Sequence, residues 1–515
     1  AGGIVQINAT DMVDVQRAVV IDASGQVLSN VNGNLINIEA GMINVEGVLQ
    51  ANGTVVSSDG GVIRLVANGN SSNCFGCTLD SVRGINTVQA GLPIMEDVFT
   101  QPEADMLLAR REQLLNGSKT ADGSIYVSDN GRVSANGYSG QQTGNGGAVI
   151  LVAVNDVYNE GLIQANGGHG ANAPKTPTAG GDGGVITLSA MDDIVNSSIV
   201  QANGGNGGNA THNVQLANAD NAQFDFEFND PQTNLWSNLG EISATVADAS
   251  CSNGASGGDG GTIALAYGDT MLNTQVIEAN GGQGGDGASA SATDTTVGTC
   301  NTSDLAGAVA VGGEGGDGGN GGLIVFSGDD NPTGNGTVSA NGGQGGQGGD
   351  ATALADASSG KHAGAYAKAY AGHGGTGGDA GTVVAPNPNT FETTQAYSAK
   401  AGAEGHSGDA SATALGGAPK NTPGKLKTQY GHAIADANTG NYGSAMANAT
   451  SYGVDASRSD AKAVTGDYGH SQASADADGK WYTYANSTTN SGDFSTASSV
   501  ADANGGVASC NTPVS

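Results

Sequence analysis

The sequence has few of the large side chains that fill ordinary hydrophobic cores, and it has little positive charge. Aromatic residues make up 4% of the 515 positions and charged residues 13%. These fractions exclude a thick core of large side chains. Lysine and arginine total 17 against 49 acidic residues, a formal net charge of −32. This imbalance argues against nucleic acid and anionic membranes as partners, and it favours cation binding or solubility as the role of the acidic surface.

Long apolar runs and a recognisable signal peptide are also missing. Because no stretch of about 18 apolar residues occurs, the sequence predicts no membrane span. The chain starts at Ala1 rather than at methionine, so we expect that a signal peptide was removed or that the chain was trimmed. We therefore predict a secreted protein, either extracellular or attached to a cell surface.

Cysteine is scarce, with five residues in the chain. Cys74 and Cys77 lack a surrounding βαβ pattern, so we expect a local disulfide rather than a redox site. Cys251 and Cys300 lie in successive insertions between repeats and form a second candidate disulfide. Cys510 is then left over, either as a free thiol or as a link to another chain.

Glycine, in contrast, is abundant, with 88 residues. Glycine loses the most backbone entropy on folding, so composition alone favours disorder. A chain of this composition folds when thin repeated layers bury small side chains and satisfy backbone hydrogen bonds between neighbours.

The clearest repeat is Gly-Gly-x-[Ile/Val]-x-[Leu/Phe]. Its alternation predicts strands with one buried face. The expected inward pairs are Ile63/Leu65, Val149/Leu151, Ile186/Leu188, Ile263/Leu265 and Ile324/Phe326. A second pattern, [Leu/Ile/Val]-x-Ala-Asn-Gly, follows 14 residues later, as from Val149 to Ile163. The constant spacing predicts one coil of a solenoid, made of a strand, a short polar turn, a second strand and an Asn-Gly corner.

Insertions of variable length follow the Asn-Gly corner. Both ends of each long insertion carry Gly-Gly-x tracts, which predict either three-fold extended helices, related to polyproline II, or ordinary tight strands. Alternating alanines inside the insertions, as in residues 351–357, predict thin strands and hairpins. Separately, residues 102–117 show the pattern of one short amphipathic helix.

The C-terminal quarter has a period of 13 residues, marked by Gly440, Gly453, Gly466, Gly479, Gly492 and Gly505. It predicts a stacked β array, with each unit either a coil of a narrow roll or a strand of a meander. Four aromatic residues follow the glycines and predict a ladder along one edge, used for packing or for binding glycans. They are Tyr442, Tyr468, Trp481 and Phe494.

Together these patterns predict an all-β fold, a parallel β-helix or solenoid with glycine-rich excursions, a stacked C-terminal array and one short helix. The expected regions are an N-terminal solenoid at 1–137, solenoid rungs with excursions at 138–425, and the 13-residue array at 426–515.

Residues 148–168, AVILVAVNDVYNEGLIQANGG, resemble the haemagglutinin-type repeat of bacterial surface adhesins such as filamentous haemagglutinin. The resemblance covers roughly residues 1–345 with interruptions. It implies a right-handed parallel β-helix that works at a bacterial cell surface in adhesion or biofilm. The matching positions are Val149, Leu151, Ala153, Asn159, Gly161, Ile163, Ala165 and Gly167.

Four aspartates end segments similar to the calcium-binding Gly-Gly-x-Gly-x-Asp motif, namely Asp286, Asp317, Asp350 and Asp379. True calcium rolls repeat this motif every nine residues, whereas these copies are far apart in sequence, so calcium is a candidate ligand only if stacking brings them together. The alternative is that the aspartates form turns. No other cofactor is predicted.

The first functional hypothesis is a structural subunit that self-assembles through its solenoid ends into an extracellular fibre, biofilm matrix or surface layer. Strand-like ends without a polar cap favour this hypothesis. The second is a monomeric adhesin that binds glycans, such as extracellular polysaccharide, or a host surface. The third is a β-helical polysaccharide-active enzyme, but no compact catalytic pattern is visible, so we predict that the chain is not an enzyme.

Overall fold

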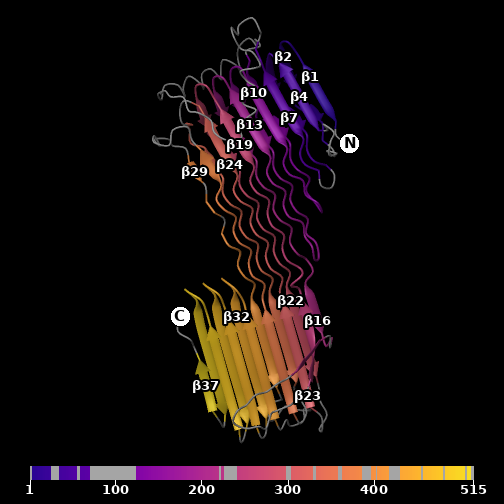
Figure 1. Cartoon of the computed structure of the whole chain (residues 1–515), viewed down its shortest axis with the longest axis vertical. Coiled ribbons are helices and arrows are strands. Elements are labelled where there is room, and N and C mark those ends of the chain that lie inside the picture. The colour runs from indigo at the N-terminus through magenta and orange to yellow at the C-terminus, as the bar shows by residue number, and fades with distance from the viewer. Residues whose placement is uncertain are drawn as a thin grey trace.

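The computed structural model consists of two β-sheet bodies joined by long glycine-rich segments that lie side by side (Figure 1). Within the described residues all regular structure is β and nearly all strand pairs are parallel, which confirms the predicted all-β solenoid. The predicted helix at 102–117 lies outside the described residues. The structure describes residues 3–24, 34–54, 58–69, 123–219, 222–225, 241–296, 303–328, 332–357, 362–384, 396–398, 400–401, 403–416, 430–453, 456–479, 482–504 and 507–511.

The first body, the β-helix, has three parallel sheets, which we name A, B and C. Sheet A contains β1 (Ile4–Asn8), β4 (Leu35–Ala40), β7 (Val62–Ala67), β10 (Ala148–Ala153), β13 (Val185–Ala190), β19 (Thr262–Ala266), β24 (Leu323–Ser327) and β28 (Thr382–Val384). Sheet B contains β2 (Met12–Val15), β5 (Met42–Val45), β8 (Ile125–Val127), β11 (Val157–Asn159), β14 (Ile194–Asn196) and β20 (Met271–Asn273). Sheet C contains β3 (Val20–Asp22), β6 (Val48–Gln50), β9 (Arg132–Ser134), β12 (Leu162–Gln164), β15 (Ile199–Gln201), β21 (Val276–Glu278), β25 (Thr337–Ser339) and β29 (Ala396–Ser398).

The core of the β-helix consists of columns of similar aliphatic side chains, in which each coil contributes one residue to each column. The predicted inward pairs occupy them, and Ile63, Leu151 and Ile186 are all 0% exposed. The first six coils cross sheets A, B and C in turn, whereas the last two have described strands in sheets A and C alone. The sequence pattern did not predict sheet B, because its strands fall within the expected polar turn, and several are three residues long, too short to show a period of two.

The second body, the Ala sandwich, consists of two facing sheets, D and E. Sheet D contains β16 (Val214–Ala217), β22 (Ala290–Thr296), β26 (Ala351–Ala357), β30 (Ala410–Gly416), β32 (Ser444–Gly453), β34 (His470–Gly479) and β36 (Thr496–Asn504). Sheet E contains β17 (Ala222–Asp225), β18 (Glu241–Asp248), β23 (Ser303–Val311), β27 (His362–Tyr370), β31 (Tyr430–Asn438), β33 (Ala456–Val464), β35 (Tyr482–Asn490) and β37 (Val507–Asn511).

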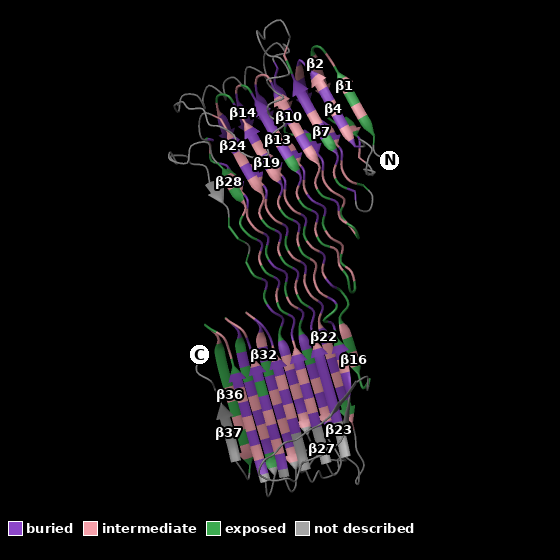
Figure 2. Ribbon diagram, in the orientation of Figure 1, coloured by how far each residue is buried: buried purple, intermediate pink, exposed green. Residues whose placement is uncertain are grey.

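All buried hydrophobic residues of the core cluster between sheets D and E are alanines. Buried and half-buried residues alternate along its strands (Figure 2). Most of the predicted hairpins are wrong. Successive alanine strands such as β26 and β27 lie in opposite sheets, and each pairs in parallel with its equivalent in the preceding excursion. An antiparallel pair does join β17 to β18. Parallel pairing is preferred because it stacks alanine on alanine, as in Ala353 on Ala412.

The 13-residue period is half of one coil. Strand β32 pairs with β34 and β33 with β35, each with a shift of 26 residues, as between Ala445 and Ser471. Two 13-residue units, one in each sheet, therefore make one coil of a narrow two-sided roll, which decides between the two arrangements that the period allowed.

The glycine tracts between the bodies are packed three-fold helices rather than strands. Their hydrogen bonds repeat every three residues: the Gly281 N–H donates to Asn341 of the next outgoing tract, the Gly282 N–H to Gly258 of a returning tract, and the Gln283 N–H to a side chain of the preceding outgoing tract. Successive residues thus bond in different directions, as three-fold symmetry requires. The second glycine of each triplet is buried, whereas the third residue faces solvent.

The bodies are built from interleaved segments, not from consecutive stretches of chain. The chain leaves the β-helix after β15, β21 and β25, and it returns as β19, β24 and β28. The divisions expected at 137/138 and 425/426 therefore do not coincide with the two bodies. Composition could not show this, because segments of the two bodies alternate along the chain.

Gly285→Ala tests the close packing of the tracts. A Cβ atom at Gly285 would lie 2.0 Å from the carbonyl oxygen of Gly208. We expect the free energy of unfolding to fall by about 3 kcal/mol, the upper end for overpacking. Gln283→Ala, at a neighbouring exposed position, is the matched control and should change stability by less than about 0.5 kcal/mol. Chemical denaturation followed by circular dichroism measures both, and equal stability of the two variants would contradict the packing.

Candidate functional site

A column of asparagines runs along the β-helix at the Asn-Gly corners. The side-chain oxygen of each corner residue accepts the backbone N–H of the corner residue in the next coil. Asn203 N donates to Asn166 Oδ1 at 2.9 Å, and Asn280 N donates to Asn203 Oδ1 at 2.8 Å. The column begins at Ser24, whose Oγ accepts from Asn52 N, and ends at Lys400, whose N–H donates to Asn341 Oδ1. The sequence motif thus encodes an inter-coil hydrogen bond.

The four aspartates predicted to bind calcium belong to similar columns in the glycine tracts. Asp286 Oδ1 accepts from Gln347 N at 2.9 Å, and Asp350 Oδ1 accepts from Asp409 N at 2.9 Å. Asp317 Oδ1 accepts from both the backbone N–H and the hydroxyl of Thr376, each at 2.8 Å.

Asp379 donates its own N–H to Asn320 Oδ1 at 2.9 Å. Most neighbours of these aspartates in their columns carry amides or hydroxyls, as Asn209, Ser289 and Asn320 do. Among the described residues no three His, Cys, Asp or Glu side chains are grouped to hold a metal ion. The structure shows that Asp286, Asp317 and Asp350 accept backbone hydrogen bonds, and calcium binding stays a prediction.

The aromatic ladder is present and includes a histidine that the sequence did not suggest. His406, Tyr442, Tyr468 and Phe494 stack in sequence, with ring centroids 4.9, 5.0 and 5.1 Å apart. Trp481 lies outside the described residues. Because stacking occupies most ring faces, the ladder leaves mainly ring edges for a glycan, whereas Phe494 at the end of the stack is 81% exposed.

The ladder residues occupy unusual backbone positions. Tyr442, Tyr468 and Phe494 have φ of 59°, 56° and 56°, in the left-handed region that residues with a side chain rarely adopt. The residue before each ring continues an inter-coil column, since Asp467 N donates to Asn441 Oδ1 at 2.8 Å. Ring stacking and this column together hold each tight turn, which indicates packing rather than a free binding surface.

Two of the five cysteines, Cys251 and Cys510, lie among the described residues. Cys251 is exposed and its thiol is free, so the structure does not form the predicted bridge to Cys300. Cys300 itself, together with Cys74 and Cys77, lies outside the described residues. Cys510 lies in β37 opposite Ser487 of β35.

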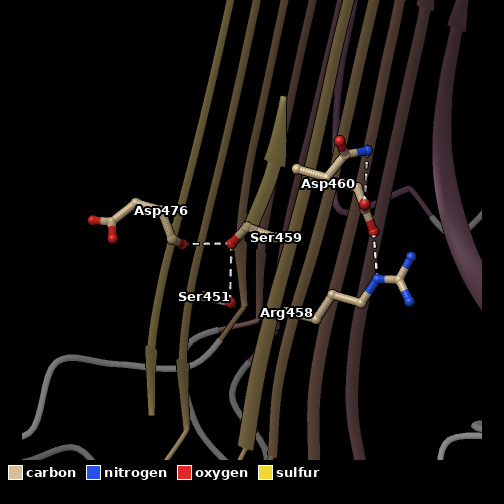
Figure 3. A network of polar contacts seen from close by, with 6 residues as sticks. Ser451, Arg458, Ser459, Asp460 and Asp476 are labelled. Atoms are coloured by element: carbon tan, nitrogen blue, oxygen red, sulfur yellow. Dashed lines mark hydrogen bonds and ion pairs between the residues drawn. The ribbon is translucent and has the colours of Figure 1, made fainter. Parts of the chain in front are cut away.

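Polar residues replace alanine in the core of the last coils. Ser459 of β33 contacts two strands of the opposite sheet, bonding to Ser451 Oγ at 2.9 Å and to the Asp476 carbonyl at 2.5 Å (Figure 3). On the outer face Arg458 pairs with Asp460 at 2.6 Å and lies over the ring of Tyr484. The serine contacts join the two facing sheets, and the contact of Arg458 with Tyr484 joins neighbouring strands of sheet E.

A buried acidic column lies where the chain turns into sheet B. Asp193 N donates to Asp156 Oδ1 at 3.1 Å, and Thr270 donates to Asp193 Oδ1 from its N–H at 3.1 Å and from its hydroxyl at 2.9 Å. Burial raises the pKa of Asp193, and the carboxylates of Asp269 and Asp192 add to the shift, while the bonds from Thr270 oppose it.

The end strands of the β-helix leave their core columns partly exposed. One column joins Val5, Ile36, Ile63, Val149, Ile186, Ile263, Ile324 and Val383. Its six inner members are 0% exposed, whereas Val5 in β1 and Val383 in β28 are half-buried. The same holds in the Ala sandwich, where Val214 in β16 and Ala501 in β36 are half-buried end members.

A scan against protein-family models, a search of curated proteins and a search of solved structures each found no match to this chain. The resemblance to haemagglutinin-repeat adhesins therefore stays an expectation drawn from the residues. The described part of the chain contains no helix with the length and apolar character that crossing a bilayer requires.

Asn166→Ala tests the asparagine column. The substitution leaves the Asn203 N–H without its acceptor, so we expect a loss of about 1–3 kcal/mol of stability and faster hydrogen exchange at Asn203. Asn166→Asp keeps an acceptor oxygen and is the matched control. Equal exchange rates at Asn203 in both variants, measured by hydrogen–deuterium exchange, would argue against the column.

Asp193→Asn tests the buried acidic column. A folded-state pKa above the unfolded value means that the folded protein binds the proton more tightly. The contribution of protonated Asp193 to the free energy of unfolding is therefore complete below the unfolded pKa, and it is lost as pH rises through the folded pKa. We expect Asp193→Asn, which keeps an acceptor oxygen, to be more stable than the parent at pH 7. The difference in melting temperature should shrink on acidification, and a constant difference would contradict the shift.

Proposed function

We propose that this chain is a structural subunit that polymerises end to end, as part of an extracellular fibre, biofilm matrix or cell-surface layer. The observation that carries the proposal is the partial exposure of core columns at the end strands. In the column of Val5 and Val383 a further coil would bury both ends as fully as the inner members, which are 0% exposed.

The edges also carry backbone groups suited to strand addition. Leu35 N donates to Gly3 O at 3.1 Å, and Ala9 N donates to Glu39 O at 2.9 Å. Odd-numbered residues of β1 therefore face β4, and alternation directs the backbone groups of Ile4, Gln6 and Asn8 away from the sheet. An exposed row of such groups is a template for pairing with another chain.

A protein that works by assembly also accounts for the lack of a compact ligand site in the part of the chain that the structure describes. The polar side chains of the tracts and corners mostly accept hydrogen bonds from neighbouring coils. Their large number follows from the need to satisfy the backbone at every coil, because glycine tracts have no side-chain core to stabilise them.

The extracellular setting is part of the proposal and rests on the resemblance to surface adhesins and on the acidic composition. The two other hypotheses, a monomeric adhesin and a polysaccharide-active enzyme, stay predictions. No contact among the described residues favours either over assembly, since the aromatic faces are largely used for stacking.

Electron microscopy of the purified chain in negative stain tests the proposal. We expect uniform filaments that survive chelation with EDTA, because the described contacts between coils use backbone and side-chain hydrogen bonds rather than ions. Single short rods at all concentrations would contradict polymerisation, and loss of filaments in EDTA would restore calcium as a structural ligand.

Gln6→Pro tests whether assembly uses the β1 edge. Proline removes the N–H that faces away from β4 and is tolerated at strand edges. Because Gln6 is exposed and its N–H makes no bond to β4, the monomer should keep its stability while filament yield falls at least roughly tenfold, the loss expected for about 1.4 kcal/mol per contact. Gln6→Ala is the matched control, and equal yields from both variants would show that the β1 edge is not used.

A further inference from the structure

We propose that successive copies meet in a staggered joint. In this joint β28 and β29 of one copy continue sheets A and C onto β1 and β3 of the next. The projecting end of the Ala sandwich of the first copy then lies beside the opening coils of the β-helix of the second. The inference rests on the proposed function, since it names the surfaces through which the polymer forms.

The chain connections place the two bodies out of step along the stacking direction. The coils formed by β1–β12 precede any excursion into sheets D and E, because the first such excursion follows β15. At the other end, β32–β37 extend the Ala sandwich beyond β28 and β29, the last strands of sheets A and C. The β-helix therefore projects at one end of the subunit and the Ala sandwich at the other, and the tracts run obliquely between them (Figure 1).

The two projections fit one another in length. A polymer of identical copies requires both bodies to advance by the same rise per copy. Sheets A, C and E each contain eight strands, so each advances by about 38 Å at 4.7–4.9 Å per strand. When β28 meets β1 of the next copy, β37 consequently arrives next to β17 of that copy. Sheet D has seven strands, so the joint leaves a gap of one strand between the D sheets of successive copies.

The core columns continue in phase across the joint. The register from coil to coil aligns Thr382 with the column of Ile4, and Val383 with the column of Val5. Both valines are half-buried in the single copy. Placing β28 against β1 in this register covers both and continues a column of aliphatic side chains.

Charge supports the same register in sheet C. The asparagine column runs from Ser24 to Lys400, so the joint brings Lys400 against Ser24 of the next copy. Unlike the asparagines of the column, Lys400 has no side-chain oxygen to accept the Ser24 N–H of the next copy. The Ser24 N–H does not need this acceptor, because it already donates to Asp22 Oδ1 at 2.8 Å. Lys400 is exposed, and in the joint its ammonium group lies within reach of the Asp22 carboxylate.

A pair of engineered cysteines tests the joint in the full chain. Ile4→Cys and Thr382→Cys are introduced together in a Cys251→Ser, Cys510→Ser background, which removes the exposed thiol of Cys251 and the candidate intermolecular thiol of Cys510. The two positions lie on opposite edge strands of sheet A, seven strand spacings or about 34 Å apart, so a disulfide between them has to join two copies. We expect a ladder of covalent oligomers on denaturing gels without reductant after mild oxidation of filaments.

Ile4→Cys with Val384→Cys is the matched control. It uses the same two strands but shifts one cysteine by two residues, to a Cα–Cα distance of about 8 Å in the joint. That distance exceeds the limit of about 7 Å for a disulfide. We expect at least roughly fivefold more covalent oligomer from the first pair. Filaments in which the two pairs react equally, or neither reacts, would overturn the staggered joint while leaving the proposed function intact.

Charge reversal gives a second, independent measurement. Lys400→Glu should raise the critical concentration for filament formation about two- to fivefold, in line with an exposed ion pair. Adding Asp22→Asn, which keeps an acceptor for Ser24, should reverse most of that increase. Filaments with an unchanged critical concentration in both variants would overturn the joint, whereas a complete absence of filaments in the parent protein would overturn the proposed function itself.

Discussion

The structure depends on one interaction, the backbone hydrogen bond between each coil and the equivalent residues of the next coil. In the β-helix these bonds form parallel sheets, in the tracts they link three-fold helices, and in the Ala sandwich they form parallel sheets again. The same stacking direction runs through both bodies and the tracts, so a side chain that helps one coil can help the next in the same way. Thin cores of alanine and short aliphatic columns are sufficient because the backbone carries much of the order.

Glycine is required where three-fold helices pack against neighbours in several directions. At Gly285 a Cβ atom would lie 2.0 Å from a neighbouring carbonyl oxygen, so this position requires glycine. The third residue faces solvent and is often polar, because its side chain can accept an N–H from the next tract. The acidic character of the chain arises partly from this requirement, since aspartate and asparagine both serve as such acceptors.

In the proposed function, the columns that stabilise neighbouring coils within one chain also join successive copies. A chain whose inner coils are stabilised by identical neighbours has end coils that lack one neighbour, and polymerisation supplies it. The aromatic turns of the last coils serve the same stacking, since each ring lies on the ring of the preceding coil. The stacked aromatic rings and the aspartates of the tracts are thus engaged in contacts within the solenoid.

The sequence by itself determined the strands with a clear period of two, their inward faces, the glycine tracts and the aromatic ladder. These features are local, and alternation or a period of three is visible within a few residues. The tertiary structure decided the rest: sheet B, the pairing of alanine strands across excursions, the 26-residue coil and the offset between the bodies. Partners in one column are 37, 77 or 61 residues apart, as from Asn166 to Asn203, Asn280 and Asn341. Such unequal spacings leave no period in the sequence, because insertions change the chain length between partners without changing the stacking that pairs them.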